Sequence, residues 1–323
     1  MAINDLLADI KDDLAQVEKN ILGHLNTEIP LLNEVAQYIL ESGGKRLRPA
    51  ILIIAAKMFN FEGDSVYKAA GAIEYLHTAT LLHDDVVDDA DLRRTRKAAR
   101  KIWGNQASVL VGDYLLATAF RTLTLLGNVP VLETVSWATS LMAKGEILQL
   151  IRQYDTATES EYLDIIIHKT ACLFAAAAKI GAAFGGADEK QQEALYGFGN
   201  EIGIAFQIID DALDYAQERG QIGKSLGQDL KERKITLPLS HLLKIAGPDE
   251  KTALDDILKK EVIEDRDVLT VVGMMQEHQV LPYTLGEARK FAEQGKARLE
   301  TLPDLPGRRS LAQLADFVVD REL

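Results

Sequence analysis

Hydrophobic residues recur at intervals of three and four along almost the whole chain. The first such stretch runs through Leu6, Ile10, Leu14, Val17, Ile21 and Leu25. This spacing gathers apolar side chains on one face of an α-helix, and the alternation typical of strands is scarce. Gly, Pro or Asn clusters interrupt it at 41–44, 59–64, 127–130, 184–188, 220–227, 247–249 and 303–308. The pattern predicts an all-α chain of about ten to thirteen helices.

Four segments are apolar nearly all the way round the predicted helix, namely 66–82, 107–126, 162–184 and 195–213. Such helices lie in the middle of a bundle, with neighbours on every side. No linker-like stretch and no repeat of fixed period divides the 323 residues. We therefore expect one continuous domain over residues 1–323.

Composition excludes several classes of function. The net charge of −13 argues against a nucleic-acid surface and a polybasic membrane anchor, since both need accumulated Lys and Arg. Residues 1–11 include Asp5, Asp9 and Lys11 and do not resemble a signal peptide, and the apolar runs are too short to span a bilayer. The single cysteine, Cys172, allows no intramolecular disulfide and is predicted to be a buried thiol. A cytoplasmic protein without a transmembrane segment or nucleic-acid partner is expected.

Two acidic clusters stand at the ends of apolar helices. Asp84, Asp85 and Asp88 follow the apolar segment 73–82, and Asp210, Asp211 and Asp214 follow the apolar segment 203–206. Residues four apart lie on one helical face, about 6 Å from each other. An acidic run is often only a solvated helix end. Here the same spacing occurs twice after buried segments, where carboxylates are costly unless cations compensate them.

Such paired carboxylates suit a hard divalent ion. Mg²⁺ prefers oxygen ligands and is normally shared between one or two carboxylates and substrate phosphates. Zinc does not suit this chain, because its six His residues are scattered and it has one Cys. The sequence predicts a metal-bridged diphosphate as ligand.

A Gly-rich turn, Gly43 to Arg48, carries Lys45, Arg46 and Arg48 just before a predicted helix. Cations and free backbone N–H groups at a helix start can bind an anion. For this segment alone, a solvated turn remains the alternative.

Taken together, these segments resemble the trans-polyprenyl diphosphate synthase family, with motifs in the family's order through most of the chain. The matching segments are 44–49, 74–88, 112–116, Gly145 and Glu146 with Gln149, Lys169 and Thr170, 206–214, and Gly223 and Lys224 with Gly227, Asp229, Leu230 and Lys234. The resemblance implies an isoprenoid-synthase bundle around a deep central cavity and an enzyme that joins isopentenyl diphosphate to an allylic diphosphate of the farnesyl or geranyl type. It also implies a homodimer and about three Mg²⁺ ions per active site.

The resemblance assigns roles residue by residue. Asp84, Asp88 and Asp210 resemble direct Mg²⁺ ligands, with Asp85, Asp211 and Asp214 as further or water-mediated ones. The family's binders of the allylic diphosphate correspond to Arg93, Lys169, Thr170, Gln207, Lys224 and Lys234, and its isopentenyl diphosphate pocket corresponds to Lys45, Arg48, His77 and Arg94. Within these sets, the residues expected to be catalytic are Asp84, Asp85, Asp88, Lys169, Asp210, Asp211 and Lys224. The chain departs from the family at 95–100, where the usual Gly, Pro-Thr and His are replaced, and at Arg233, where Gly is common.

Product length is expected to depend on Ala79 and Thr80, about one turn before the first acidic cluster. The family places aromatic residues there when products are short, so two small residues indicate a long product. Close contact between two helices is another reason for a small Ala79. Our hypothesis is a product of about eight isoprene units, octaprenyl diphosphate, for a quinone side chain, within a range of about 35 to 50 carbons. An extended chain of that length needs a tunnel on the order of 40 Å. The alternatives are a medium-chain synthase, a class I terpene cyclase, a non-catalytic partner subunit and a purely structural bundle.

Overall fold

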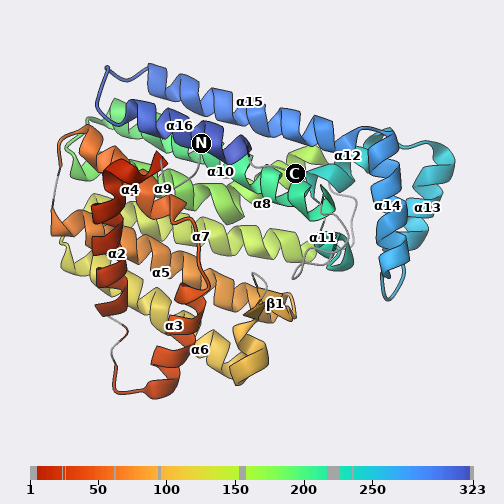
Figure 1. Cartoon of the computed structure of the whole chain (residues 1–323), viewed down its shortest axis with the longest axis horizontal. Helices are drawn as coiled ribbons and strands as arrows, with labels where there is room; N and C mark the ends of the chain where they lie inside the picture. Colours follow the sequence, from red (N-terminus) through yellow and green to blue (C-terminus); the bar gives the residue numbers. More distant parts are fainter. Residues whose placement is uncertain are drawn as a thin grey trace.

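The computed structural model of the chain describes residues 6–23, 25, 27–61, 63–93, 96–152, 158–216, 226–234 and 236–320. They are almost entirely helical (Figure 1), which confirms the all-α prediction. In chain order the elements are η1 (Ala8–Ile10), α2 (Lys11–Gly23), α3 (Pro30–Glu41), α4 (Leu47–Met58), α5 (Asp64–Val87), β1 (Leu92–Arg93), β2 (Arg96–Lys97), α6 (Ala99–Leu125), α7 (Val129–Ile151), α8 (Glu159–Ile166), η2 (Ile167–Ala171), α9 (Cys172–Phe184), α10 (Glu189–Ala216), α11 (Gln228–Lys231), α12 (Leu237–Ile245), α13 (Pro248–Leu258), α14 (Asp265–Glu277), α15 (Val280–Glu300) and α16 (Arg308–Val319).

The helix count slightly exceeds the prediction. Elements α8, η2 and α9 form one continuous helix, Glu159–Phe184. When these three are counted as one, α2 to α16 amount to fourteen helices in the described part of the chain. One of them, α11, is a single turn of four residues that apolar periodicity cannot reveal. The two short strands pair as an antiparallel hairpin, with Arg93 opposite Arg96.

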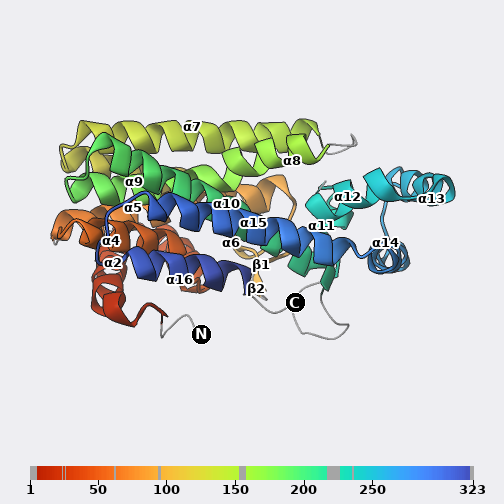
Figure 2. The same ribbon diagram turned by 90° about the horizontal axis from the view of Figure 1, so that it is seen from above.

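Helices α4, α5, α9 and α10 form the centre of the bundle. In Figure 2, α7 and α8 lie on one side of them and α2 and α16 on the other, and α15 runs along α10. Glycine lets the central helices approach closely, because a Cβ on Gly181 of α9 would lie 2.2 Å from the Leu52 carbonyl oxygen of α4. A Cβ on Gly203 of α10 would lie 2.5 Å from Ala171 Cα. This dense centre holds α5 and α10, the two helices that carry the acidic clusters, in a fixed relation.

Buried apolar residues form a large core and a smaller one. The smaller core gathers residues of α11 to α14 with Tyr215, at the C-terminal end of α10. In Figure 1, α13 and α14 project to the right of the main bundle. A single domain over residues 1–323 stays a prediction, and helix α10 supports it by giving Ile209 to the large core and Tyr215 to the smaller one.

One helix within the described residues, Glu159–Phe184, is long and apolar enough to cross a membrane by length and composition. Its most apolar window is 78% buried inside the structure. It is therefore a core helix of the bundle, and its Cys172 is buried, as the sequence predicts.

Candidate active site

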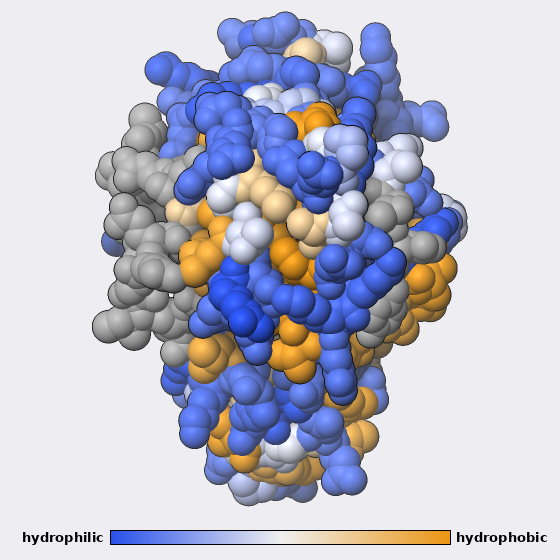
Figure 3. Space-filling model, turned by 90° about the vertical axis from the view of Figure 1, so that its right-hand side faces the viewer, coloured by the Kyte–Doolittle hydropathy of each residue, from blue (hydrophilic) through white to orange (hydrophobic). Residues whose placement is uncertain are grey.

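One cavity of about 1480 Å³ collects residues from both acidic clusters and from the basic turn. Its acidic lining includes Asp84 and Asp88 at the end of α5 and Asp210, Asp211 and Asp214 of α10. Its basic lining includes Lys45, Arg48, Arg93, Lys169 and Lys234. Figure 3 shows the side of the molecule on the right of Figure 1, largely hydrophilic with apolar residues visible near its centre. The topology thus joins groups that lie up to 189 residues apart in the sequence.

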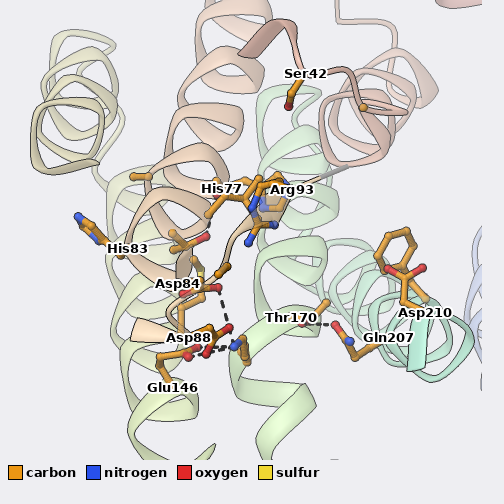
Figure 4. Close-up of a pocket in the computed structure, with 18 of the residues that line it drawn as sticks. Ser42, His77, His83, Asp84, Asp88, Arg93, Glu146, Thr170, Gln207 and Asp210 are labelled. Carbon is orange, nitrogen blue, oxygen red and sulfur yellow. Dashed lines mark hydrogen bonds and ion pairs between the residues drawn. The ribbon is translucent and has the colours of Figure 1, made fainter. Parts of the chain in front are cut away.

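Asp84 and Asp88, labelled in Figure 4, each have a lysine beside them at the end of α5. Lys169 Nζ lies 3.8 Å from Asp84 Oδ2 and 2.7 Å from Glu146 Oε2. Lys234 Nζ donates to Asp88 Oδ2 at 2.7 Å. Burial raises the pKa of Asp84 to about 6, although Lys169 opposes that shift. Asp84 therefore gives up its proton at a higher pH than an exposed aspartate does.

Asp85 is placed differently from its neighbours. It is fully buried and accepts a hydrogen bond from Arg93 Nε at 2.6 Å. Its other carboxylate oxygen, Oδ2, is buried without a hydrogen-bond partner. Burial raises the pKa of Asp85, with Arg93 opposing. Its contact therefore orients Arg93, which itself lines the cavity.

In the second cluster, Asp211 is the buried member. It accepts hydrogen bonds from Tyr162 OH at 2.7 Å and from Gln207 Nε2 at 2.8 Å. Burial nevertheless raises the pKa of Asp211 to about 7. Asp214 accepts from the backbone N–H groups of Gln228 at 3.2 Å and Asp229 at 2.9 Å, which ties the start of α11 to α10. Asp210, labelled in Figure 4, is half-buried at the cavity wall.

Lys169 and Thr170 lie in η2, a π-helical turn inside the long helix. Such turns insert one residue into an α-helix and occur often at functional sites. Gly145 of α7 makes room for this turn, because a Cβ there would lie 2.5 Å from the Lys169 backbone nitrogen. Thr170 Oγ1 donates to Gln207 Oε1 at 2.8 Å. The turn thereby brings Lys169 to the first cluster and Thr170 to the second.

The basic turn contributes Lys45 and Arg48 to the cavity lining, together with His77 of α5. Lys45 Nζ lies 4.8 Å from the ring centroid of Phe317, and Arg48 Cζ lies 4.2 Å from that of Phe174. Two predicted diphosphate binders, Arg94 and Lys224, lie outside the described residues.

The candidate chain-length residues also line the cavity. Ala79 is 1% exposed, and the Thr80 hydroxyl donates to the His77 carbonyl oxygen at 2.8 Å. Leu116, Thr139, Met142 and Ala143 continue the lining on α6 and α7. Two small side chains thus belong to the cavity lining on the same helix that ends at the first acidic cluster.

Three contributors escaped the sequence interpretation. Glu146 pairs with Lys169, Tyr162 donates to Asp211, and Glu232 lies 2.7 Å from Lys234. Glu146 was part of a family motif without an assigned role, so that motif was the available signal. No local pattern singled out Tyr162 or Glu232.

The donor set fits Mg²⁺ shared with a substrate. No three of His, Cys, Asp and Glu converge as a preformed cage in the described part of the chain. The facing groups are carboxylate oxygens on two helices, with cations nearby. Mg²⁺ commonly uses only one or two carboxylates and completes its shell with water and phosphate oxygens. The arrangement therefore suits an ion that arrives with a diphosphate.

The buried carboxylates predict a pH-dependent stability of the metal-free protein. Folding raises the pKa of Asp84 to about 6 and that of Asp211 to about 7. A raised carboxyl pKa means that the folded state binds the proton more tightly, so this stability is present at low pH and lost on raising the pH from about 4 to about 7. We expect roughly 2 to 5 kcal/mol of unfolding free energy to be lost over that range. Denaturant unfolding in a chelating buffer measures it.

The matched variant is Asp211→Asn, which keeps the shape of the side chain and cannot ionise. Its unfolding free energy should depend less steeply on pH than that of the wild type. An identical pH dependence in both proteins would contradict the assignment of the effect to this cluster.

Comparison with known proteins agrees with this geometry. The sequence profile of the polyprenyl synthetase family matches residues 29–275. An octaprenyl diphosphate synthase from Escherichia coli (strain K12) is 40% identical over 325 residues, covering 99% of this chain and 98% of the relative. An octaprenyl diphosphate synthase from Haemophilus influenzae is 37% identical, over 99% of this chain and 98% of that protein.

Solved structures give the same result. A decaprenyl diphosphate synthase from Rhodobacter capsulatus superposes with a TM-score of 0.93 at 39% identity, covering 99% of both chains. A polyprenyl synthase from Caulobacter crescentus CB15, complexed with calcium and isoprenyl diphosphate, gives a TM-score of 0.95 at 38% identity, over 100% of this chain and 98% of that one. With its two aspartate clusters on one cavity, the chain belongs to the polyprenyl synthetase family.

Proposed function

We propose that this protein is a long-chain polyprenyl diphosphate synthase that adds isopentenyl diphosphate units head-to-tail to an allylic diphosphate. The observation that carries the proposal is the single cavity lined by aspartates of α5 and α10, by cations and by small residues at Ala79 and Thr80. The family and the octaprenyl diphosphate synthase relatives support the same activity. We further propose a product of about eight isoprene units for a quinone side chain, and a cytoplasmic enzyme.

The allylic diphosphate is bound by cations that already lie beside the aspartates. Lys169 lies next to Asp84, and Lys234 next to Asp88. Burial lowers the pKa of Lys234, but Asp88 and Glu232 outweigh burial and raise it, so its ammonium stays charged. Arg93, Thr170 and Gln207 complete the described binding groups, and Lys224 joins them by resemblance.

Asp84, Asp88 and Asp210 would hold Mg²⁺ directly, and Asp211 and Asp214 would act through water or as further ligands. About three ions, when bound, would stabilise the charge that develops on the departing diphosphate. Asp85 would act mainly through Arg93, since it is fully buried against that side chain. The calcium and isoprenyl diphosphate bound by the Caulobacter crescentus relative support a cation-dependent site.

Apolar and small residues protect the reacting carbons. Phe174, Phe206, Leu116 and Met142 line the same cavity as the aspartates. Such walls exclude water, which would otherwise capture the allylic cation before the isopentenyl double bond attacks it. The departing diphosphate can take the final proton, so no side chain need act as base.

The test is product formation by the purified protein alone. We expect farnesyl diphosphate, labelled isopentenyl diphosphate and Mg²⁺ to yield a diphosphate of about eight isoprene units, resolved by chromatography against standards. A product that stops at about fifteen or twenty carbons would indicate a medium-chain synthase. Cyclic hydrocarbon from the allylic substrate alone would indicate a terpene cyclase. No turnover without a second protein would indicate a partner subunit.

Binding of Mg²⁺ together with inorganic pyrophosphate is expected to raise the unfolding temperature. A ligand present at about 100 times its Kd stabilises the folded state by about 2.7 kcal/mol. Pyrophosphate without a divalent ion, and Mg²⁺ without pyrophosphate, should each give a smaller shift, because the ion completes its shell with phosphate oxygens. Differential scanning fluorimetry measures all three, and equal shifts would contradict a metal-bridged diphosphate.

We propose a homodimer paired through α6 and α7. Exposed apolar side chains gather on these helices, and each is more than half exposed: Leu110, Leu125, Val129, Trp137, Ile147 and Ile151. Such a surface suits a partner helix pair. Sedimentation should give twice the chain mass of 35.6 kDa, and a monomer mass at assay concentration would refute the pairing.

A further inference from the structure

The basic turn before α4 holds three cations, but one of them faces protein carboxylates. Arg46 Nε donates to Glu18 Oε1 at 2.6 Å, its Nη1 donates to Glu74, and its Nη2 donates to the Leu40 carbonyl oxygen at 3.1 Å. The Arg46 side chain is 15% exposed. Two carboxylates thus match its charge, and three of its donors are bonded to protein oxygens, while Arg46 and Glu74 also belong to the cavity lining.

Glu74 is the buried partner in this contact. It lies in the middle of α5 and is 6% exposed. A buried carboxylate is costly to keep unless a cation is bonded to it. Burial lowers the pKa of Arg46, but Glu74 and Glu18 outweigh burial and raise it. The contact therefore fixes a charged pair between the turn and α5.

The backbone of Arg46 needs such support. Its φ of 47° and ψ of 38° lie in the left-handed region, which L residues other than Gly, Asn and Asp seldom adopt. The three side-chain contacts hold this conformation at the residue before α4. On either side of it, Lys45 reaches Phe317 of α16 and Arg48 reaches Phe174 of α9.

Helix α5 connects the contact between Arg46 and Glu74 to the acidic end of the cavity. His77, one turn after Glu74, lines the cavity, and Asp84 follows ten residues after Glu74. Ten residues of α-helix span about 15 Å. Because a helix of this length is stiff and buried along most of its course, a turn fixed to Glu74 is also fixed in its distance from Asp84.

We propose that Arg46 is a positioning residue: bonded to Glu74 and Glu18, it holds the turn so that Lys45 and Arg48 receive the diphosphate of the isopentenyl substrate at a set distance from the first aspartate cluster. This inference rests on the proposed function. In this proposal Arg46 acts through the turn, because its Nε, Nη1 and Nη2 already donate to protein oxygens. Its effect should fall on isopentenyl diphosphate and spare the allylic diphosphate, whose candidate binders lie on β1, η2, α10 and the residues after α11.

Two variants and one matched control test the proposal. Glu74→Gln keeps the shape of the partner and removes its charge. The double variant Arg46→Gln/Glu74→Gln removes both buried charges and leaves only Glu18, which is 42% exposed and can turn to water. The control is Asp13→Asn, because Asp13 is also buried and also ties α2 to α4 and α5, through Lys57 at 2.6 Å and Tyr67 at 2.8 Å. Asp13 does not line the cavity.

The main readout is the Kd for isopentenyl diphosphate, measured by calorimetry without Mg²⁺, because the basic turn needs no metal to bind an anion. We expect Kd to rise about tenfold in both variants and to stay within about twofold in Asp13→Asn. In turnover assays the KM for isopentenyl diphosphate should rise by a similar factor, with the KM for the allylic substrate nearly unchanged. A merely structural role would instead lower the unfolding temperature and shift both KM values together.

Either of two results would overturn the proposal: an unchanged Kd in Glu74→Gln and the double variant, or an equal loss in Asp13→Asn. Calorimetry also separates it from the proposed function. If the wild type forms polyprenyl product while the variants bind isopentenyl diphosphate normally, only the role of Arg46 fails. If the wild type binds isopentenyl diphosphate but forms no product, the proposed function fails. The variants then still test whether Arg46 positions the basic turn.

Discussion

Asp84→Asn is expected to lower kcat by on the order of 1000-fold, with a much smaller change in the KM for isopentenyl diphosphate. Asp84 lies at the end of α5, lines the cavity and has Lys169 as its cationic neighbour. If its carboxylate holds Mg²⁺ against the departing diphosphate, the substitution removes a charge that matters most in the transition state. Initial rates over a range of Mg²⁺ concentrations measure both the loss and any increase in the Mg²⁺ needed for half-maximal rate.

The control is Asp64→Asn, the same substitution in the first turn of the same helix. Asp64 is exposed and, among the described residues, forms an ion pair with Lys68 across one helical turn, at 2.5 Å, a contact of small energetic weight. Its rate should match that of the wild type. An Asp84→Asn enzyme that keeps more than about a tenth of wild-type kcat would remove Asp84 from the metal ligands.

Ala79→Phe is expected to shorten the main product to about fifteen or twenty carbons. Ala79 is 1% exposed within a cavity wall that continues to Leu116 and Met142. A phenyl ring at that position would fill the path of the growing chain, so that elongation stops early. The added volume should also cost about 1 to 3 kcal/mol of stability. Sizing the labelled products detects the shift in length, and thermal unfolding detects the cost.

Ala79→Ser is the matched substitution, since it adds a single oxygen and leaves the path open. It should keep the wild-type product. An unchanged product length in a folded Ala79→Phe enzyme would mean that Ala79 is small for helix packing alone, the alternative that the sequence left open.

The helical fold was predictable because each segment carries its own periodic pattern. Ile10, Leu14 and Val17 repeat at helical spacing whatever they pack against, and all three fall in η1 or α2. The two acidic clusters were predictable for a related reason: four-residue spacing places Asp84 and Asp88 on one helical face without any knowledge of neighbours.

Roles that depend on packing were not predictable. Asp84 and Asp85 are adjacent and identical in type, yet only the rotation of α5 and the position of Arg93 decide which of them faces the cavity. The π-turn at Lys169 depends on Gly145 of another helix, which leaves space for it. The contact between Asp88 and Lys234 joins residues 146 positions apart. Likewise, Arg46 in sequence is one of three similar cations, and its contacts with Glu18 and the buried Glu74 distinguish it in the structure.

The most direct test is a crystal structure of the protein with Mn²⁺ in place of Mg²⁺ and an unreactive analogue of the allylic diphosphate. Anomalous scattering locates the manganese ions independently of the protein atoms. We expect ions bound to Asp84 and Asp88 on one side and to Asp210 on the other, all contacting the same diphosphate. Ions bound elsewhere, or a diphosphate that no aspartate-bound ion touches, would show that the two helices do not share a metal-dependent site.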